Sequence, residues 1–149
     1  MFDETDDDAT VLRALELLRR GDAPAELEAM VPALTELANS GDPDAAFVLG
    51  GIYMVALDSD ELAVEAFEQA GDHPGAMRML ADLVDAGRGV ARDELRATQL
   101  YADAAALGDM VAQYAMSRRE RDPAKARRWL EQSAAQGYAD ALAALRRST

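Results

Sequence analysis

The stretch Gly-Asp-Met-Val-Ala at residues 108–112, with Met116 four positions after the alanine, decides how this chain folds, because the same phrase occurs four times. In each copy a glycine with an acidic residue or a tyrosine precedes an alanine, and an apolar residue follows four positions later. The copies begin at Gly41, Gly71, Gly108 and Gly137, so they are 30, 37 and 29 residues apart. Repetition at this period is typical of stacked helix pairs and not of a single globular core.

The turn at each of these glycines has a local physical explanation. Glycine readily adopts the left-handed backbone conformation that ends a helix, and a following aspartate accepts hydrogen bonds from the first N–H groups of the next helix. A proline one or two residues later falls in the first turn of that helix, where its missing N–H costs nothing. The residues expected to act as N-caps are Asp22, Asp42, Asp72, Asp109 and Asp122.

Apolar residues spaced three and four apart predict an all-α fold. The expected helices span residues 8–20, 24–39, 43–56, 60–70, 74–86, 93–107, 109–119, 123–136 and 138–147. Pro32 is expected to kink or divide the second of them. We interpret residues 1–149 as a single domain with a flexible acidic arm at 1–7, a diverged first helix pair at 8–40, repeats at 41–136 and a capping helix at 137–149.

The second helix of each expected pair carries a pattern of its own, in which residues 93–108 recur in step as residues 122–137. Together with the glycine phrase, this pattern resembles the Sel-one-like repeat family, a relative of the tetratricopeptide repeats. The matching residues are Ala45, Leu49, Gly50 and Tyr53 in the first half of the family phrase, Gly87, Gly89, Val90 and Asp93 in its loop, and Lys125, Ala126 and Trp129 in its second half. The resemblance covers residues 41–145 and implies a right-handed superhelix (solenoid) of about four antiparallel helix pairs plus a C-terminal capping helix.

The composition limits the compartment and the chemistry. Half of the residues are apolar but only 5% are aromatic, so the core is expected to consist of Ala, Leu, Val and Met. The absence of cysteine excludes disulfides and thiolate metal sites. No apolar run approaches the roughly 18 residues that span a bilayer, and the acidic N-terminal segment is unlike the basic start of a signal peptide. We therefore expect a cytoplasmic protein with no membrane partner.

The charge is distributed unevenly along the chain. Residues 1–77 contain 18 acidic residues and three basic ones, a balance of −15, whereas residues 78–149 contain 10 acidic and 12 basic residues, a balance of +2. A basic partner would be steered towards the N-terminal half. The alternative is that the low isoelectric point only keeps the protein soluble.

No set of residues in the sequence has the arrangement of a catalytic, cofactor or metal site. His73 is the only histidine and has no Ser or Cys near it, so we expect an exposed structural residue. Asp6, Asp7 and Asp8 would bind a cation only weakly and are more typical of a solvated acidic segment before a helix. The stretch at residues 87–90 lacks the Lys-Ser/Thr ending of a phosphate-binding loop. The sequence predicts no enzyme and no cofactor.

One basic cluster lies near the end of the chain. Its members are Arg118, Arg119, Arg121, Lys125, Arg127 and Arg128. The interleaved aromatic residues that read bases are absent, and a net charge of −13 repels phosphate. We expect these side chains to pair with acidic neighbours or to solvate a helix face, without a nucleic-acid partner.

The family resemblance also implies a binding surface, because the first helix of each pair lines a concave groove in tetratricopeptide arrays. With Ala45, Leu49 and Tyr53 facing the partner helix, other positions are left for the groove. The expected groove residues are Phe47, Gly51 and Met54 in one pair, Arg78, Asp82 and Asp85 in the next, and Tyr114, Arg118 and Arg121 in the third. Arg and aromatic side chains are typical binding anchors. The alternative for Phe47 and Met54 is that they are core residues packed on the preceding pair.

These observations favour a non-enzymatic protein-interaction module, either an adaptor or a scaffold. It would bind a peptide or helix of another protein in the groove, as a monomer or weak dimer. The alternative is an acidic inhibitor that neutralises one basic partner, since proteins that resemble this family occur as immunity proteins against bacterial toxins.

Overall fold

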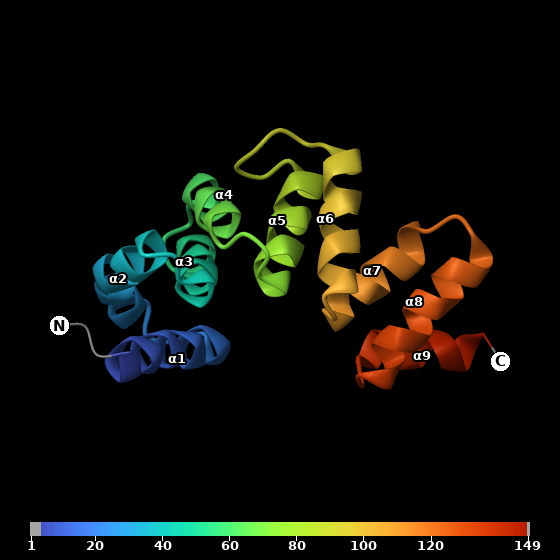
Figure 1. Cartoon of the computed structure of the whole chain (residues 1–149), viewed down its shortest axis with the longest axis horizontal. Helices are drawn as coiled ribbons and strands as arrows, with labels where there is room; N and C mark the ends of the chain where they lie inside the picture. The colour runs from blue at the N-terminus through green and yellow to red at the C-terminus, as the bar shows by residue number, and fades with distance from the viewer. Residues whose placement is uncertain (1–3, 149) are drawn as a thin grey trace.

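The computed structural model describes residues 4–148, with side chains from Asp6 onward, and this part of the chain forms nine α-helices and no strand. The helices are α1 (Glu4–Arg20), α2 (Pro24–Asn39), α3 (Pro43–Val55), α4 (Asp60–Gln69), α5 (Pro74–Ala86), α6 (Glu94–Ala106), α7 (Met110–Arg119), α8 (Pro123–Ala135) and α9 (Ala139–Arg147). Each packs on the next, and together they form an arch with α1 and α9 at its two ends (Figure 1). The predicted all-α solenoid is confirmed.

The helix boundaries agree with the sequence prediction to within one residue, except at the beginning of α1. Residues 4–7, predicted as part of a flexible arm, instead form the first turn of α1, and residues 1–3 of that arm lie outside the described residues. Carboxylates are favourable near a helix N-terminus, where they interact with the positive end of the helix dipole. The acidic segment is therefore the beginning of α1.

Pro32 does not divide α2, which continues from Pro24 to Asn39. Proline removes one intrahelical hydrogen bond, which would normally be made to the carbonyl of Glu28. Both Pro32 and Glu28 are exposed to solvent. Water can therefore satisfy the freed carbonyl, and the helix tolerates the proline.

Three predicted N-caps are confirmed. The Asp42 carboxylate accepts hydrogen bonds from the backbone N–H groups of Asp44 and Ala45 at 2.9 and 3.1 Å. Asp109 accepts one from Ala112 at 2.8 Å, and Asp122 caps α8 in the same way. These bonds satisfy backbone donors that would otherwise lack a partner inside the helix.

Two predicted N-caps are wrong, Asp22 and Asp72. In both turns one extra residue separates the aspartate from a proline, and the proline fixes the first position of the helix. The N-cap is therefore the inserted residue, Ala23 before Pro24 and His73 before Pro74. His73 accepts a hydrogen bond from the backbone N–H of Ala76 through Nδ1 at 3.1 Å. Ala23 has no side-chain acceptor and adopts a left-handed backbone with φ of 60°.

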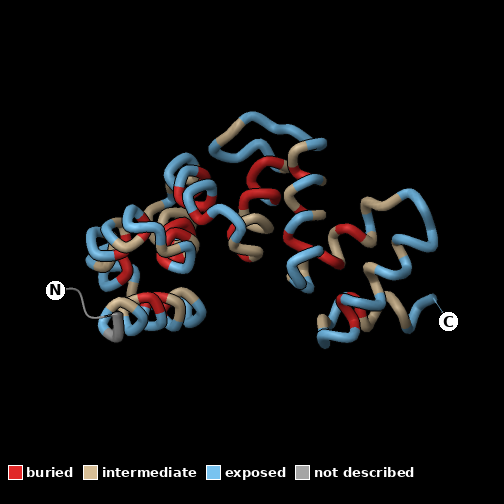
Figure 2. Tube along the Cα trace, in the orientation of Figure 1, coloured by how far each residue is buried: buried red, intermediate tan, exposed pale blue. Residues whose placement is uncertain are grey.

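The core is a continuous stripe between neighbouring helices, and buried residues follow it along most of the arch (Figure 2). Many of the buried residues are alanines, and larger apolar side chains are buried among them. The largest fully buried apolar side chains are Phe67, Leu17, Leu34, Ile52 and Leu83. No helix within residues 4–148 has both the length and the apolar character needed to cross a membrane.

Polar contacts between residues about one repeat apart hold neighbouring pairs in register. The loop after α5 lies against the beginning of α4, where Arg88 donates two hydrogen bonds to the Asp60 carboxylate, each of 3.0 Å. Gly89 makes this approach possible, because a Cβ there would lie 2.5 Å from the Asp60 backbone. Further along, Arg96 pairs with Glu68 at 2.7 Å. The family-type loop is thus an inter-repeat contact.

Candidate protein-interaction site

A cleft of about 420 Å³ lies where α5, α6 and α7 meet. Its lining residues are Asp85, Glu94, Tyr101, Ala115, Arg118 and Arg119. Asp85 comes from the last turn of α5, and Arg118 and Arg119 come from the last turn of α7. The cleft therefore brings together two of the predicted groove residues, Asp85 and Arg118, from different helix pairs.

Arg119 forms a fixed wall of this cleft. Its guanidinium donates to the Asp85 carboxylate at 2.6 Å and to the Thr98 hydroxyl at 2.9 Å. It also lies over the Tyr101 ring, 4.7 Å from the ring centroid. Only about a quarter of the Arg119 side chain is exposed, so water competes weakly with these contacts. Arg119 joins α5, α6 and α7 at one point.

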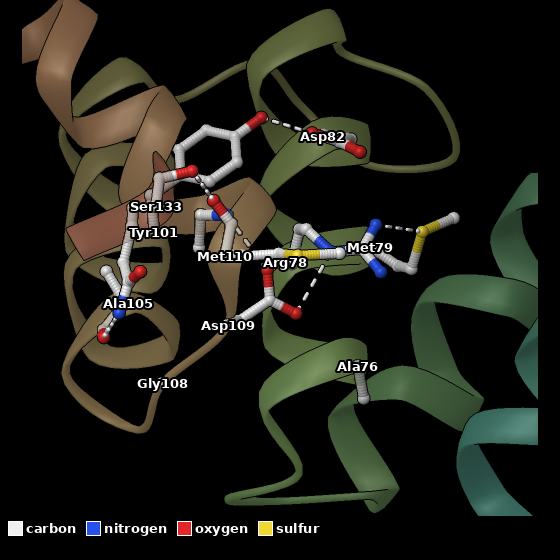
Figure 3. Close-up of polar contacts among 12 residues, drawn as sticks. Ala76, Arg78, Met79, Asp82, Tyr101, Ala105, Gly108, Asp109, Met110 and Ser133 are labelled. Carbon is white, nitrogen blue, oxygen red and sulfur yellow. Dashed lines mark hydrogen bonds and ion pairs between the residues drawn. The ribbon is translucent and has the colours of Figure 1, made fainter. Parts of the chain in front are cut away.

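Tyr101 supports the same wall from α6. Its hydroxyl donates a short hydrogen bond to the Asp82 carboxylate (Figure 3). Burial raises the pKa of Tyr101 well above its ordinary value, and the hydrogen bond to Asp82 adds to this effect. The phenol therefore stays protonated at neutral pH and remains a donor. Asp82, a predicted groove residue, is held by Tyr101.

Arg118 differs from Arg119 because it points to solvent. Its side chain is exposed, and its guanidinium lies 6.0 Å from the centroid of the Tyr114 ring. No carboxylate of the described residues lies within ion-pair distance of it. Tyr114 itself is half-buried and packs against Tyr138 at the beginning of α9, with 5.4 Å between ring centroids. Arg118 is thus a charged side chain that is available to a partner.

Arg78, predicted to line the groove, is held within the chain. Its guanidinium donates to the Asp109 carboxylate at 3.2 Å and contacts the sulfur of Met79 (Figure 3). The Arg78 and Asp109 side chains are 22% and 14% exposed, so this pair is largely shielded from water. Since Asp109 also caps α7, Arg78 fixes α7 relative to α5. Arg121, another predicted groove residue, is exposed in the connection after α7 ends at Arg119.

The predicted apolar end of the groove, on α3, is filled by other parts of the chain. The Phe47 ring stacks on the His73 ring at the beginning of α5, with centroids 4.4 Å apart. Met54 is half-buried against the core. Gly51 is covered by α1, because a Cβ there would lie 3.0 Å from a Leu18 methyl group. Phe47 and Met54 therefore pack against the core, as the alternative held, and the Phe47 ring stacks on the following helix pair.

His73 was predicted to be an exposed residue with a structural role. The predicted exposure is wrong. Its side chain is only 19% exposed, because Phe47 covers one face of the ring. Its Nε2 lies 3.1 Å from the Asp44 carboxylate, while Nδ1 caps α5. Nδ1 therefore stabilises the beginning of α5, and Nε2 and the ring face link α5 to α3.

Tyr101, Arg119 and Glu94 were not predicted from the sequence as cleft residues. The available signal was Tyr101, whose spacing from Ala97 and Ala104 puts a polar ring at a buried position. The basic cluster predicted at residues 118–128 does not form one patch. Arg119 faces α5 and α6, whereas Lys125 and Arg128 line a separate cleft on α8 beside Trp129.

Comparison with known proteins agrees with the repeat architecture. The family model of the Sel1 repeat matches residues 74–109 and 111–138, which cover α5 to α8. No curated protein matches the sequence.

Two solved structures show similar folds. The crystal structure of a Sel1 repeat protein from Oxalobacter formigenes is 33% identical, with a TM-score of 0.69, and the match covers 76% of this chain and 95% of that one. A protective antigen present in uropathogenic Escherichia coli strains displays an SLR fold and is 22% identical, with a TM-score of 0.74. That match covers 91% of this chain but only 32% of the antigen, and it concerns the fold alone. The repeat phrase, the helical arch and the similarity to the Oxalobacter protein together place this chain in the Sel1 repeat family.

Proposed function

We propose that this protein is a non-catalytic interaction module that binds a segment of a partner protein in the cleft between α5, α6 and α7. The observation that carries the proposal is the contrast between two adjacent arginines. Arg119 is fixed by Asp85, Thr98 and Tyr101, whereas Arg118 is exposed at the same cleft. The first makes a rigid wall and the second supplies a charge that the chain itself does not satisfy.

The chemistry of the cleft favours a segment that presents a carboxylate or a row of backbone carbonyls to Arg118. A guanidinium binds carboxylates through two parallel hydrogen bonds, which gives geometric specificity as well as affinity. Glu94 pairs with Arg92 at 3.1 Å, but its side chain is 71% exposed, so it can accept a further hydrogen bond from a donor group of the same segment. Because Asp82, Asp85 and Tyr101 already hold the walls, binding requires little rearrangement.

The test is to isolate the partner from the native host and to measure its affinity for the purified full chain by calorimetry. We expect Arg118→Glu to weaken binding by about tenfold or more, since it reverses the charge of an interfacial anchor. The matched control is Arg128→Glu, which makes the same charge change at an exposed arginine in the separate cleft on α8. Equal affinities of the wild type and Arg118→Glu, with unchanged helix content, would refute the site.

A second candidate function is an acidic inhibitor that neutralises one basic protein, and the uneven charge of the chain favours it. Residues 1–77 carry a balance of −15 and residues 78–149 a balance of +2. An inhibitor of this kind is expected to have one tight partner and an association rate that falls steeply with added salt. Several partners with weak, salt-tolerant binding would instead favour an adaptor.

A further inference from the structure

A second cleft, of about 360 Å³, lies between α1 and the beginning of α3, far along the chain from the cleft proposed above. Its lining residues are Asp8, Val11, Leu12, Leu15, Asp42 and Asp44. Its floor is apolar and all three of its polar lining residues are aspartates. We call it the α1–α3 groove.

Leu12 is the unusual residue in this groove, because 65% of it is exposed. Val11, Ala14 and Leu17 form the stripe of α1 that is buried in the core. Leu12 lies beside this stripe, one helical turn before Leu15. A large apolar side chain exposed inside a cleft is typical of a surface that a partner covers.

The apolar surface along α1 is covered at one end and open at the other. Leu12, Leu15 and Leu18 are three residues apart, so they form a second apolar row on one side of the helix. Leu18 is covered by α3 at Gly51, and Leu15 is half-buried. At Leu12 the groove is lined on the other side by Asp42, the N-cap of α3, and Asp44, which are polar, and the leucine stays exposed. The row therefore continues into a groove with nothing over it in residues 4–148.

The charge around the groove limits what can cover it. Asp42 accepts hydrogen bonds from two backbone N–H groups of α3. The side chain of Asp44 is 66% exposed and has His73 as its neighbour. Within the described part of the chain, no Lys or Arg pairs with Asp8, Asp42 or Asp44. A ligand must therefore supply apolar side chains for Leu12 and positive charge for the rim.

We propose that the α1–α3 groove binds an amphipathic helix of a partner protein, with apolar residues three and four apart and Lys or Arg on either side of them. A helix is favoured because the groove lies between two helices, and no strand edge exists in residues 4–148 on which an extended peptide could pair. The proposal depends on the protein being an interaction module, but it concerns a different surface and a different ligand chemistry.

The probe for this proposal is a synthetic helical peptide of about 18 residues, with Leu at helical spacing on one face and Lys elsewhere. Binding of the labelled peptide to the full chain is measured by fluorescence anisotropy. Two control peptides separate shape from charge: one has the same composition reordered so that no apolar face forms, and one has Glu in place of Lys. We expect saturable binding of the amphipathic Leu/Lys peptide and no saturable binding of either control peptide.

Two substitutions locate the peptide on the protein. Leu12→Ser is expected to weaken binding by about tenfold, and Asp8→Asn by about threefold. The matched controls are Leu95→Ser on α6, where the leucine is 86% exposed, and Glu65→Gln on α4, an exposed carboxylate. Both controls should stay within about twofold of the wild type. Hydrogen exchange in residues 8–18 should slow when the peptide binds.

Each other outcome overturns the proposal. If the reordered peptide binds as tightly as the amphipathic one, binding depends on charge alone. If Leu12→Ser and Leu95→Ser have the same affinity for the peptide, the groove is not the binding site. If sedimentation shows a dimer that Leu12→Ser dissociates, a second copy of this chain occupies the groove instead. The Arg118→Glu variant should bind the peptide normally. Loss of the peptide in that variant alone would refute the α1–α3 groove and leave the α5–α7 cleft as the binding site.

Discussion

The α1–α2 hairpin at one end of the arch and the α5–α8 repeats share the same kind of apolar core but differ in how their helices are capped. Leu17 and Leu34 are as deeply buried in the first region as Leu83 is in the second. All four helices from α5 to α8 begin with a side-chain cap, whereas α2 begins at Ala23 without one. Both regions have an ion pair between helices, Arg13 with Glu26 in the first and Arg78 with Asp109 in the second, so the difference between them lies in the N-cap of α2.

The two candidate binding surfaces differ in their polar contacts. In the α5–α7 cleft, polar bonds fix the walls and leave one charged side chain, Arg118, for a partner. In the α1–α3 groove no such network covers the helix, so apolar surface at Leu12 stays exposed inside an acidic rim. The first surface is suited to polar recognition by a rigid site, and the second to burial of an apolar helix.

The largest expected effect tests what the two regions share, which is tight packing of alanines. Ala105 and Ala38 each lie three residues before a turn glycine, and they are 2% and 3% exposed. Ala105→Leu and Ala38→Leu should each lower the free energy of unfolding by about 1–3 kcal/mol, because the added atoms have no space. Urea unfolding followed by circular dichroism measures this change.

The matched control for that pair is Ala106→Leu, since Ala106 is exposed on the same helix as Ala105. It should change the stability by less than about 0.5 kcal/mol. If Ala38→Leu were harmless while Ala105→Leu was costly, the cores of the two regions would differ as well, and the comparison would need to include packing.

A smaller effect tests what differs between the regions, which is the role of the aspartate after the turn glycine. Asp109 caps α7 and binds Arg78, whereas Asp22 is exposed, caps no helix and pairs only with Arg20 at the surface. Asp109→Ala should cost about 1–2 kcal/mol, because it removes a cap and leaves Arg78 without its partner. Asp22→Ala should cost less than about 0.5 kcal/mol, since exposed ion pairs contribute little.

Thermal unfolding of the two aspartate variants side by side is the measurement. Equal losses would show that Asp22 does more than its exposed position indicates, and would place a structural cap in the first hairpin after all. In double-mutant cycles on the free energy of unfolding, Arg78 and Asp109 should show a strong coupling, whereas Arg20 and Asp22 should show little.

The fold could be predicted from the sequence because it depends on short-range patterns. The Gly-Asp phrase and the three-and-four spacing of Ala and Leu define nearly every helix boundary without reference to distant residues. The errors arose where two local rules competed. Proline fixed the beginning of α2 and α5, so the cap moved from Asp22 and Asp72 to the residue before each proline.

The candidate site was harder to predict, because it depends on which side chains meet across repeats. Helical spacing placed Arg78, Asp82 and Asp85 on one face, but it could not show that each already has a partner within the chain. Those partners lie 31, 19 and 34 residues away and depend on the rotation between neighbouring pairs. Of the two predicted residues that line the cleft, Asp85 pairs with Arg119, whereas Arg118 has no ion pair among the described residues.

The smallest expected effect concerns the turns themselves and should have opposite signs in the two regions. Gly108 has φ of 97°, and no atom lies within 4 Å of the position that a Cβ would take there, so Gly108→Ala should cost about 1 kcal/mol through backbone conformation alone.

Ala23 already has φ of 60°, and Ala23→Gly relieves that strain. Greater freedom of glycine in the unfolded chain offsets part of the gain, so a stabilisation of about 0.5 kcal/mol or less is expected. Denaturant midpoints of the two variants, measured against the wild type, decide the sign. A loss in Ala23→Gly as large as that in Gly108→Ala would mean that the half-buried Ala23 methyl contributes more by packing than its backbone costs by strain. The first hairpin would then rely on apolar contact at the position where the later repeats have a side-chain cap.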